Sequence, residues 1–104
     1  MEPEKLKVIA EGMGYEVAIK PRNINGTVED AVFSFHGEVW YDPIINNDQM
    51  VEIMEKLKVG VNYDFYRDVF LSYIYDDFGV ILLSKNEGKT INEAVCNAAY
   101  EYFK

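Results

Sequence analysis

The sequence predicts an α+β domain: a three-layer α/β/α sandwich with three helices and a mostly antiparallel sheet of about five strands, in the order αβββαββα. Apolar residues recur at helical spacing in three separate segments. In the segments between them, apolar and polar residues alternate or nearly all residues are apolar, which is typical of strands. The short hairpin connections between these segments favour antiparallel pairing. In some of these strand segments the side chains on both faces are apolar. We therefore expect other elements to pack against both faces of the sheet.

The length and composition indicate one domain over residues 1–104. A chain of 104 residues, of which 49% are apolar, can bury a core without a disulfide or a structural metal. No repeat, linker or low-complexity tract divides it. A single cysteine excludes an internal disulfide and a cysteine-built zinc site. The chain shows no membrane span or signal-peptide pattern, so we expect it in the cytoplasm.

The chain begins with a predicted helix and strand. Helical spacing of apolar residues over residues 6–13, with Pro3 before them and Gly14 after them, predicts the first helix. Two sets of residues alternate over residues 15–20, with Tyr15, Val17 and Ile19 in the larger apolar set, and this pattern predicts a strand that ends at Pro21.

A turn and a hairpin follow. Asn25-Gly26, within residues 23–27, is a turn signal. Alternation over residues 31–35 and a short strand over residues 38–41 predict a hairpin with His36 in its turn. No partner nucleophile or carboxylate can be identified for this histidine, so we expect an exposed turn residue rather than a catalytic one.

A second helix is predicted between Asn46 and the neighbourhood of Gly60. Asn46 and Gln49 have the spacing of an N-cap and its reciprocal partner. Apolar residues from Met50 to Val61 follow at helical spacing, and charged residues occupy the opposite face.

The segment 63–78 is rich in aromatic residues, holding seven of the fifteen in the chain. Residues 69–75 are apolar on both alternating sets, and residues 80–83 form a second β-rich run, so both are predicted as central strands. The acidic turn 76–79 separates them, and residues 86–88 are predicted as a loop.

The final helix has the strongest pattern in the chain. Thr90 and Glu93 have capping-box spacing, and an apolar stripe extends from Ile91 to Tyr102. Cys96 lies well inside this helix among small residues, away from a helix N-terminus that would lower the pKa of its thiol. We therefore expect a buried, inert cysteine.

The net charge of −8 is concentrated in one part of the chain. Residues 29–77 hold eleven acids and three bases, whereas the two flanks together are neutral. A nonspecific nucleic-acid binder needs the opposite sign of charge, so direct nucleic-acid binding is not expected. The acids either serve solubility or form a face that binds a basic patch on another protein. We expect that face to contain Asp64, Asp68, Asp76 and Asp77.

No motif in the sequence predicts catalysis. Phosphate loops, dinucleotide-binding glycines, zinc spacings, calcium loops and nucleophile-elbow serines are missing from the sequence. Asp64 and Asp68 would be about 13 Å apart on one strand, too far for shared chemistry. Asp76 and Asp77 fit a turn. We therefore expect no catalytic residues, no metal site and no cofactor.

One group of residues fits a small-molecule ligand. Tyr63 and Tyr66 place stacking surfaces beside Arg67, a combination that can hold the base and phosphate of a nucleotide. The alternative is that the rings cover the sheet and Arg67 pairs with Asp64 or Asp68.

Several stretches resemble the small ABA-sandwich proteins of bacteriophages and prophages: Met13-Gly14 at the end of the first helix, Tyr41-Asp42-Pro43 with Asn46-Asn47-Asp48 and the following helix, and residues 88–99. The resemblance covers roughly two thirds of the chain in separate pieces. It does not extend to residues 63–78. It implies a phage-encoded three-layer sandwich, and it carries over no catalytic residues because no activity is established for that family.

These observations lead to one function hypothesis and two alternatives. The first is a non-enzymatic phage or prophage accessory protein in the host cytoplasm that inhibits a host defence component through an acidic surface. The second is a protein that binds and sequesters a small signalling nucleotide. The third is a structural or assembly protein whose exposed aromatic residues form a homo-oligomer interface. No membrane partner is expected.

Overall fold

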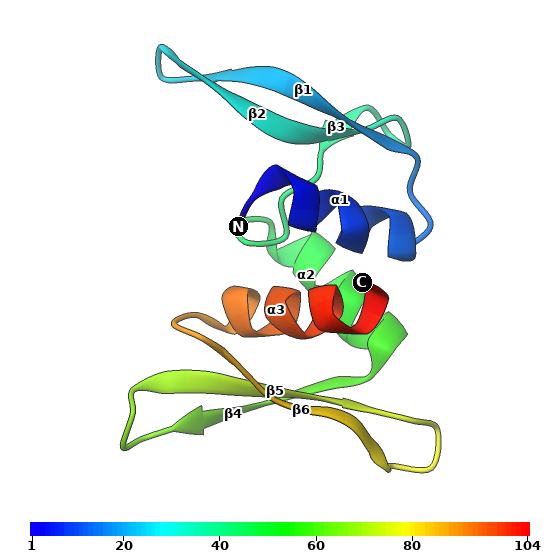
Figure 1. The fold of residues 1–104 in the computed structure, drawn as a ribbon, viewed down its shortest axis with the longest axis vertical. Helices are drawn as coiled ribbons and strands as arrows, with labels where there is room; N and C mark the ends of the chain where they lie inside the picture. The colour runs from blue at the N-terminus through cyan, green and yellow to red at the C-terminus, as the bar shows by residue number, and fades with distance from the viewer.

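Three helices form the middle of the molecule, and a small antiparallel sheet lies on each side of them (Figure 1). The computed structural model describes residues 1–104 except for the side chain of Lys85. The described backbone forms three helices and six strands in the order αβββαβββα. The α+β class, the three helices and the antiparallel pairing are therefore as the sequence predicts.

The order of the layers differs from the expectation of helices outside a single sheet. The N-terminal sheet consists of β1 (Val17–Ile24), β2 (Thr27–Ser34) and β3 (Val39–Trp40). The C-terminal sheet consists of β4 (Val59–Asp64), β5 (Val69–Tyr75) and β6 (Ile81–Gly88). Figure 1 shows the helices between these sheets, so each sheet is covered on one face and open on the other.

The N-terminal sheet is built on one long hairpin. β1 and β2 pair from Val17 opposite Ser34 to Ile24 opposite Thr27, and Asn25-Gly26 forms the predicted two-residue turn. The expectation that Pro21 ends the first strand is wrong, because β1 continues through it. Proline is tolerated there because its nitrogen faces the open edge of β1, where no ladder hydrogen bond is needed.

The second helix is shorter than predicted, and a strand takes up the remainder. α2 spans Asn47–Leu57, and Lys58 follows in a left-handed conformation with a φ of 55°. This residue ends the helix, and β4 begins at the next position, so Val61 belongs to a strand rather than to the helix. Helical spacing and strand alternation both fit this short apolar run, which is why β4 was not expected.

The C-terminal sheet places β5 in the centre and β6 at an edge, which corrects the prediction of two central strands. Ser72 and Ile74 face α3 and are buried, whereas Tyr73 and Tyr75 on the other face are half-buried. β6 extends to Gly88, so the predicted loop at residues 86–88 is also wrong.

α3 (Ile91–Phe103) is the central element of the core. Thr90 Oγ1 accepts a hydrogen bond from the Glu93 backbone N–H, as the capping box predicts. The helix contacts α1 (Pro3–Gly12), α2 and the C-terminal sheet. Its inward positions are small residues that are fully buried, namely Ala94, Val95, Cys96, Ala98 and Ala99. Small side chains let several elements approach the same helix closely.

We predict that Gly88→Ala destabilises the protein strongly. An added Cβ at this position would overlap the Ala94 backbone nitrogen and lie 2.7 Å from the carbonyl carbon of Glu93. Backbone atoms at a helix start cannot rotate away, so we expect a loss of about 2–3 kcal/mol in the free energy of unfolding. Denaturant unfolding measures this loss.

Gly12→Ala is the matched control. Its Cβ would meet the ring of Phe103, a side chain near the C-terminus that can change rotamer. Alanine also favours a helix over glycine, so we expect a smaller loss than at Gly88. Equal stability of Gly88→Ala and the wild type would contradict the close packing of β6 on α3.

Candidate functional site

The four aspartates selected from the sequence lie at two separate places on the C-terminal sheet. Asp64 and Asp68 flank the turn between β4 and β5, whereas Asp76 and Asp77 lie in the turn between β5 and β6. These turns are at opposite ends of β5 (Figure 1), about 20 Å apart at the rise per residue of a strand. The structure therefore does not bring the four carboxylates into one cluster.

Each of these aspartates has a local partner. Asp64 Oδ1 accepts hydrogen bonds from the backbone N–H groups of Tyr66 and Arg67, and Asp68 accepts one from the Tyr63 hydroxyl. Because Asp64 and Asp68 flank one tight turn, they are not separated along a straight strand as we assumed.

The second pair also stabilises a turn. Asp76 Oδ1 accepts hydrogen bonds from the backbone N–H groups of Phe78 and Val80, at 2.9 and 2.8 Å. Asp77 forms an ion pair of 2.6 Å with Lys58, which lowers the pKa of that carboxyl group. The predicted turn at these residues is confirmed.

The residues predicted to bind a nucleotide lie on β4 and on the turn between β4 and β5. Both guanidinium nitrogens at the end of Arg67 donate to the carboxylate of Glu87, rather than to Asp64 or Asp68 as the alternative supposed. The Tyr63 hydroxyl bonds to Asp68, which raises the pKa of the phenol. Tyr66 is 98% exposed at the tip of the hairpin. The groove beside the N-terminal sheet and the pocket next to it are lined by other residues.

The exposed aromatics expected at an oligomer interface are also dispersed. Phe65 and Tyr66 are on the turn after β4, and Phe78 is on the turn after β5. These are the two opposite ends of the C-terminal sheet (Figure 1), so the rings do not form one continuous patch.

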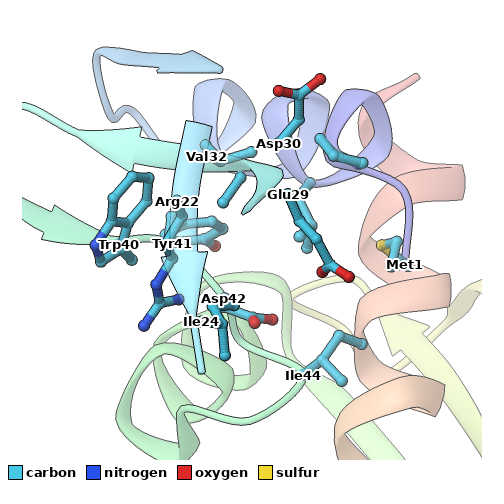
Figure 2. A pocket seen from close by; sticks show the side chains of 13 residues that line it. Met1, Arg22, Ile24, Glu29, Asp30, Val32, Trp40, Tyr41, Asp42 and Ile44 are labelled. Atoms are coloured by element: carbon cyan, nitrogen blue, oxygen red, sulfur yellow. The ribbon is translucent and has the colours of Figure 1, made fainter. Parts of the chain in front are cut away.

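A groove of about 240 Å³ lies beside the N-terminal sheet. Four consecutive residues of β2, from Glu29 to Val32, line it. The remaining lining residues come from β1, from the segment that runs from Trp40 at the end of β3 to Ile44, and from the chain start with α1. In Figure 2, Arg22 and Trp40 lie at one end of the groove and Met1 at the other. Sequence reasoning missed this site because its residues come from four separated segments.

The groove contains more acidic than basic side chains. Glu29, Asp30 and Asp42 line it, and Arg22 is the basic residue among the described lining residues. Figure 2 shows the carboxylates of Glu29 and Asp42 between Arg22 and Met1. Such a site favours a cationic partner.

A second pocket of about 270 Å³ shares Tyr41 with this groove. Asp48 and Glu52 of α2 line it, with Tyr15 and the ring of His36. The Tyr15 hydroxyl donates a hydrogen bond to Glu52, and this bond raises the pKa of the phenol to about 12. The phenol is protonated at neutral pH, and its bond to Glu52 ties the segment between α1 and β1 to α2.

Gln49 fixes the chain segment between the two pockets. The Asn46 side chain accepts from the Gln49 backbone N–H, so the predicted N-cap is confirmed. The Gln49 side chain does not bond back to the backbone of Asn46 as a capping box would require. Its Nε2 donates to the carbonyl of Trp40 at 3.0 Å, and its Oε1 accepts from the backbone N–H of Asp42 at 2.7 Å. These two bonds hold the walls that separate the groove from the second pocket.

The outward face of the N-terminal sheet combines aromatic rings with basic side chains. The Lys20 ammonium is 4.6 Å from the centre of the Phe33 ring and 4.9 Å from that of Phe35. The Arg22 guanidinium is 5.1 Å from the centre of the Trp40 ring. Among the described side chains, the ion pairs within 4.0 Å do not involve Arg22 or Lys20. Both cations thus lie on rings and carry their charge to the surface.

Cys96 and His36 are placed as the sequence predicts. Cys96 is fully buried, and burial raises the pKa of its thiol to about 12, so the nucleophilic thiolate is not formed at neutral pH. His36 is exposed in the turn between β2 and β3. The described residues contain no group of three potential metal ligands. No helix in the described part of the chain is long and apolar enough to cross a membrane.

No protein-family model, no curated protein and no solved structure matches this chain.

We predict that Tyr41→Phe increases stability. Tyr41 is 2% exposed, and its hydroxyl has no hydrogen-bond partner among the described residues. Burial also raises the pKa of this phenol, so the group stays neutral. Removing an unpaired buried hydroxyl recovers its desolvation cost, and we expect a gain of about 1 kcal/mol in the free energy of unfolding.

Thermal and denaturant unfolding of Tyr41→Phe measure this gain. Tyr15→Phe is the control, because it removes a hydroxyl that does have a partner, Glu52, and should lower stability slightly. A loss of stability in Tyr41→Phe would show that the buried hydroxyl is paired in solution.

Proposed function

We propose that this chain is a phage or prophage accessory protein that acts by binding in the host cytoplasm and inhibits a basic protein of a host defence system. The phage origin rests on a sequence resemblance to the ABA-sandwich proteins of phages at three places: the end of the first helix, the segment from Tyr41 into the second helix, and residues 88–99. The mode of action, binding rather than catalysis, rests on the surface described above.

The observation that carries this proposal is the row of carboxylates along the seam between the N-terminal sheet and the helices. Five line the two pockets that meet at Tyr41: Glu29, Asp30, Asp42, Asp48 and Glu52. Unlike the aspartates of the C-terminal turns, Glu29, Asp30 and Asp48 are neither in ion pairs nor in side-chain hydrogen bonds among the described residues. Their charge is available to attract and orient a basic surface.

Affinity capture with two matched variants tests the proposal. The seam variant carries Glu29→Gln, Asp30→Asn, Asp42→Asn and Asp48→Asn, and the turn variant carries the Asn substitution at Asp64, Asp68, Asp76 and Asp77. Both remove four charges, and Asn or Gln keeps an acceptor oxygen for local bonds. We expect the immobilised wild type to retain a basic host protein from an infected-cell lysate, with binding that weakens as salt increases.

The seam variant should lose this protein and the turn variant should keep it. Loss in the turn variant alone would place the contact on the C-terminal turns, as the sequence first indicated. If the wild type retains no host protein above a blank matrix, the proposed function is wrong.

A nucleotide-binding function is the second candidate, at a place other than Tyr63, Tyr66 and Arg67. The outward face of the N-terminal sheet favours it, because exposed rings on a sheet can stack on bases while neighbouring cations contact phosphate. Phe35 is 48% exposed there with Lys20 beside it, and Arg22 lies over the ring of Trp40 on the same face.

Calorimetry with a panel of cyclic and linear nucleotides tests this second candidate. We expect saturable heat with the wild type and an affinity about ten-fold lower for Arg22→Gln, which removes a phosphate-binding cation. Arg67→Gln is the control and should bind as the wild type does. Absence of heat with every nucleotide would remove this candidate.

A further inference from the structure

We propose that the free edge of β2 binds an extended segment of a basic partner protein as an added antiparallel or parallel strand. This inference rests on the proposed function and specifies how the partner is held. It is carried by the hydrogen-bond pattern of the hairpin, by the groove beside the strand and by the charges that line that groove.

Half of β2 has a neighbouring strand on one side only. β1 pairs with β2 along its whole length, but β3 pairs with β2 only at Phe33 and Ser34. One further bond, from the Tyr41 backbone N–H to the carbonyl of Val32, continues on the β3 side at 2.8 Å. From Thr27 to Ala31 the second edge of the strand therefore has no strand beside it.

The direction of the free backbone groups follows from the register. The two-residue turn makes Ile24 and Thr27 the first hydrogen-bonded pair of the hairpin, so alternate residues of β2 after Thr27 bond to β1. The residues between them, Val28 and Asp30, direct their N–H and C=O groups to the other edge. Val32 has the same orientation, as its bond to Tyr41 shows.

The groove lies along this edge. Side chains on a strand alternate between its two faces, so Glu29 and Ala31 project to one face, whereas Asp30 and Val32 project to the other. All four line the groove. A hollow that touches both faces of one strand must pass its edge, and this is where an added strand would lie.

Charge selects the occupant. The three acidic side chains that line the groove, Glu29, Asp30 and Asp42, outnumber its one basic side chain among the described residues, that of Arg22. This charge balance favours a segment that carries lysine or arginine. A second copy paired edge to edge about this point would place Glu29 and Asp30 against the same acids. Like charges opposite each other on paired strands are destabilising, so a basic partner is favoured over self-association.

The outer edges of β1 and β6 are less suitable for a new strand. Pro21 lies on β1 opposite Asp30, and its nitrogen has no hydrogen to donate at the outer edge of β1. The outer edge of β6 is partly covered, because the Asn97 side chain of α3 donates to the carbonyl of Glu87 at 2.6 Å.

A titration with a defined peptide tests the inference without the host partner. The probe is an eight-residue peptide of alternating lysine and valine, and the comparison peptide replaces each lysine with glutamate. In two-dimensional NMR we expect saturable shifts of the amides of Val28 and Asp30 with the lysine peptide. Hydrogen exchange at these two amides should slow when the peptide is bound.

A proline variant tests the backbone contact. Val28→Pro removes the outward N–H without altering a bond to β1, and Val28→Thr keeps that N–H with a side chain of similar shape. Binding should weaken about ten-fold in Val28→Pro and remain unchanged in Val28→Thr. Unchanged amide shifts in the wild type at saturating peptide would overturn the inference, and so would equal binding by a folded Val28→Pro.

The two proposals can fail separately. A host protein captured equally by the wild type and Val28→Pro would support the proposed function and overturn strand addition. Slowed exchange at Val28 and Asp30 with the lysine peptide would support strand addition even if no host protein is captured. A concentration-dependent dimer that Val28→Pro abolishes, with no response to the peptide, would assign the edge to a second copy and overturn the inference.

Discussion

The structure depends on the burial of α3 against several elements at once. This helix contacts α1, α2 and the C-terminal sheet, and five of its residues are inaccessible to solvent. Alanine and cysteine at the inward positions keep the helix thin enough for neighbouring backbones to approach. Ser72 supports the same contact, because its hydroxyl donates to the carbonyl of Ala94 at 2.6 Å within the core. The free energy of this packing fixes the helices as the middle layer and leaves each sheet with one open face.

The open faces explain where interactions with other molecules can occur. The hairpin of β1 and β2 projects beyond β3, which has only two residues, and so a strand edge and a groove remain beside the helices. Tyr41 forms a wall of this groove and of the second pocket, while Gln49 holds the backbone on either side of it. The site is therefore positioned by α2 and by the sheet, and its carboxylates remain at the surface.

Much of the fold could be predicted from the sequence because the signals are local. Thr90 and Asn46 start their helices, and Asn25-Gly26 closes a hairpin, through hydrogen bonds and φ values that depend on neighbouring residues. The strand after Lys58 was missed, since its apolar pattern also fits a helix and only its left-handed backbone marks the boundary. Pro21 predicts a strand end because the sequence does not show which edge of the sheet its nitrogen faces.

The sequence by itself determined the class of the fold, the turns and caps, the burial of Cys96 and the acidic character of residues 29–77. Tertiary structure alone decided how the strands divide into two sheets and which carboxylates share a surface. Asp64 and Asp76 are close in the sequence, yet they lie at opposite ends of β5. Glu29 and Asp42 are about as far apart in the sequence, yet both line one groove because the short β3 returns the chain beside β2. Proximity between distant segments depends on the packing of whole elements, which no local pattern of residues specifies.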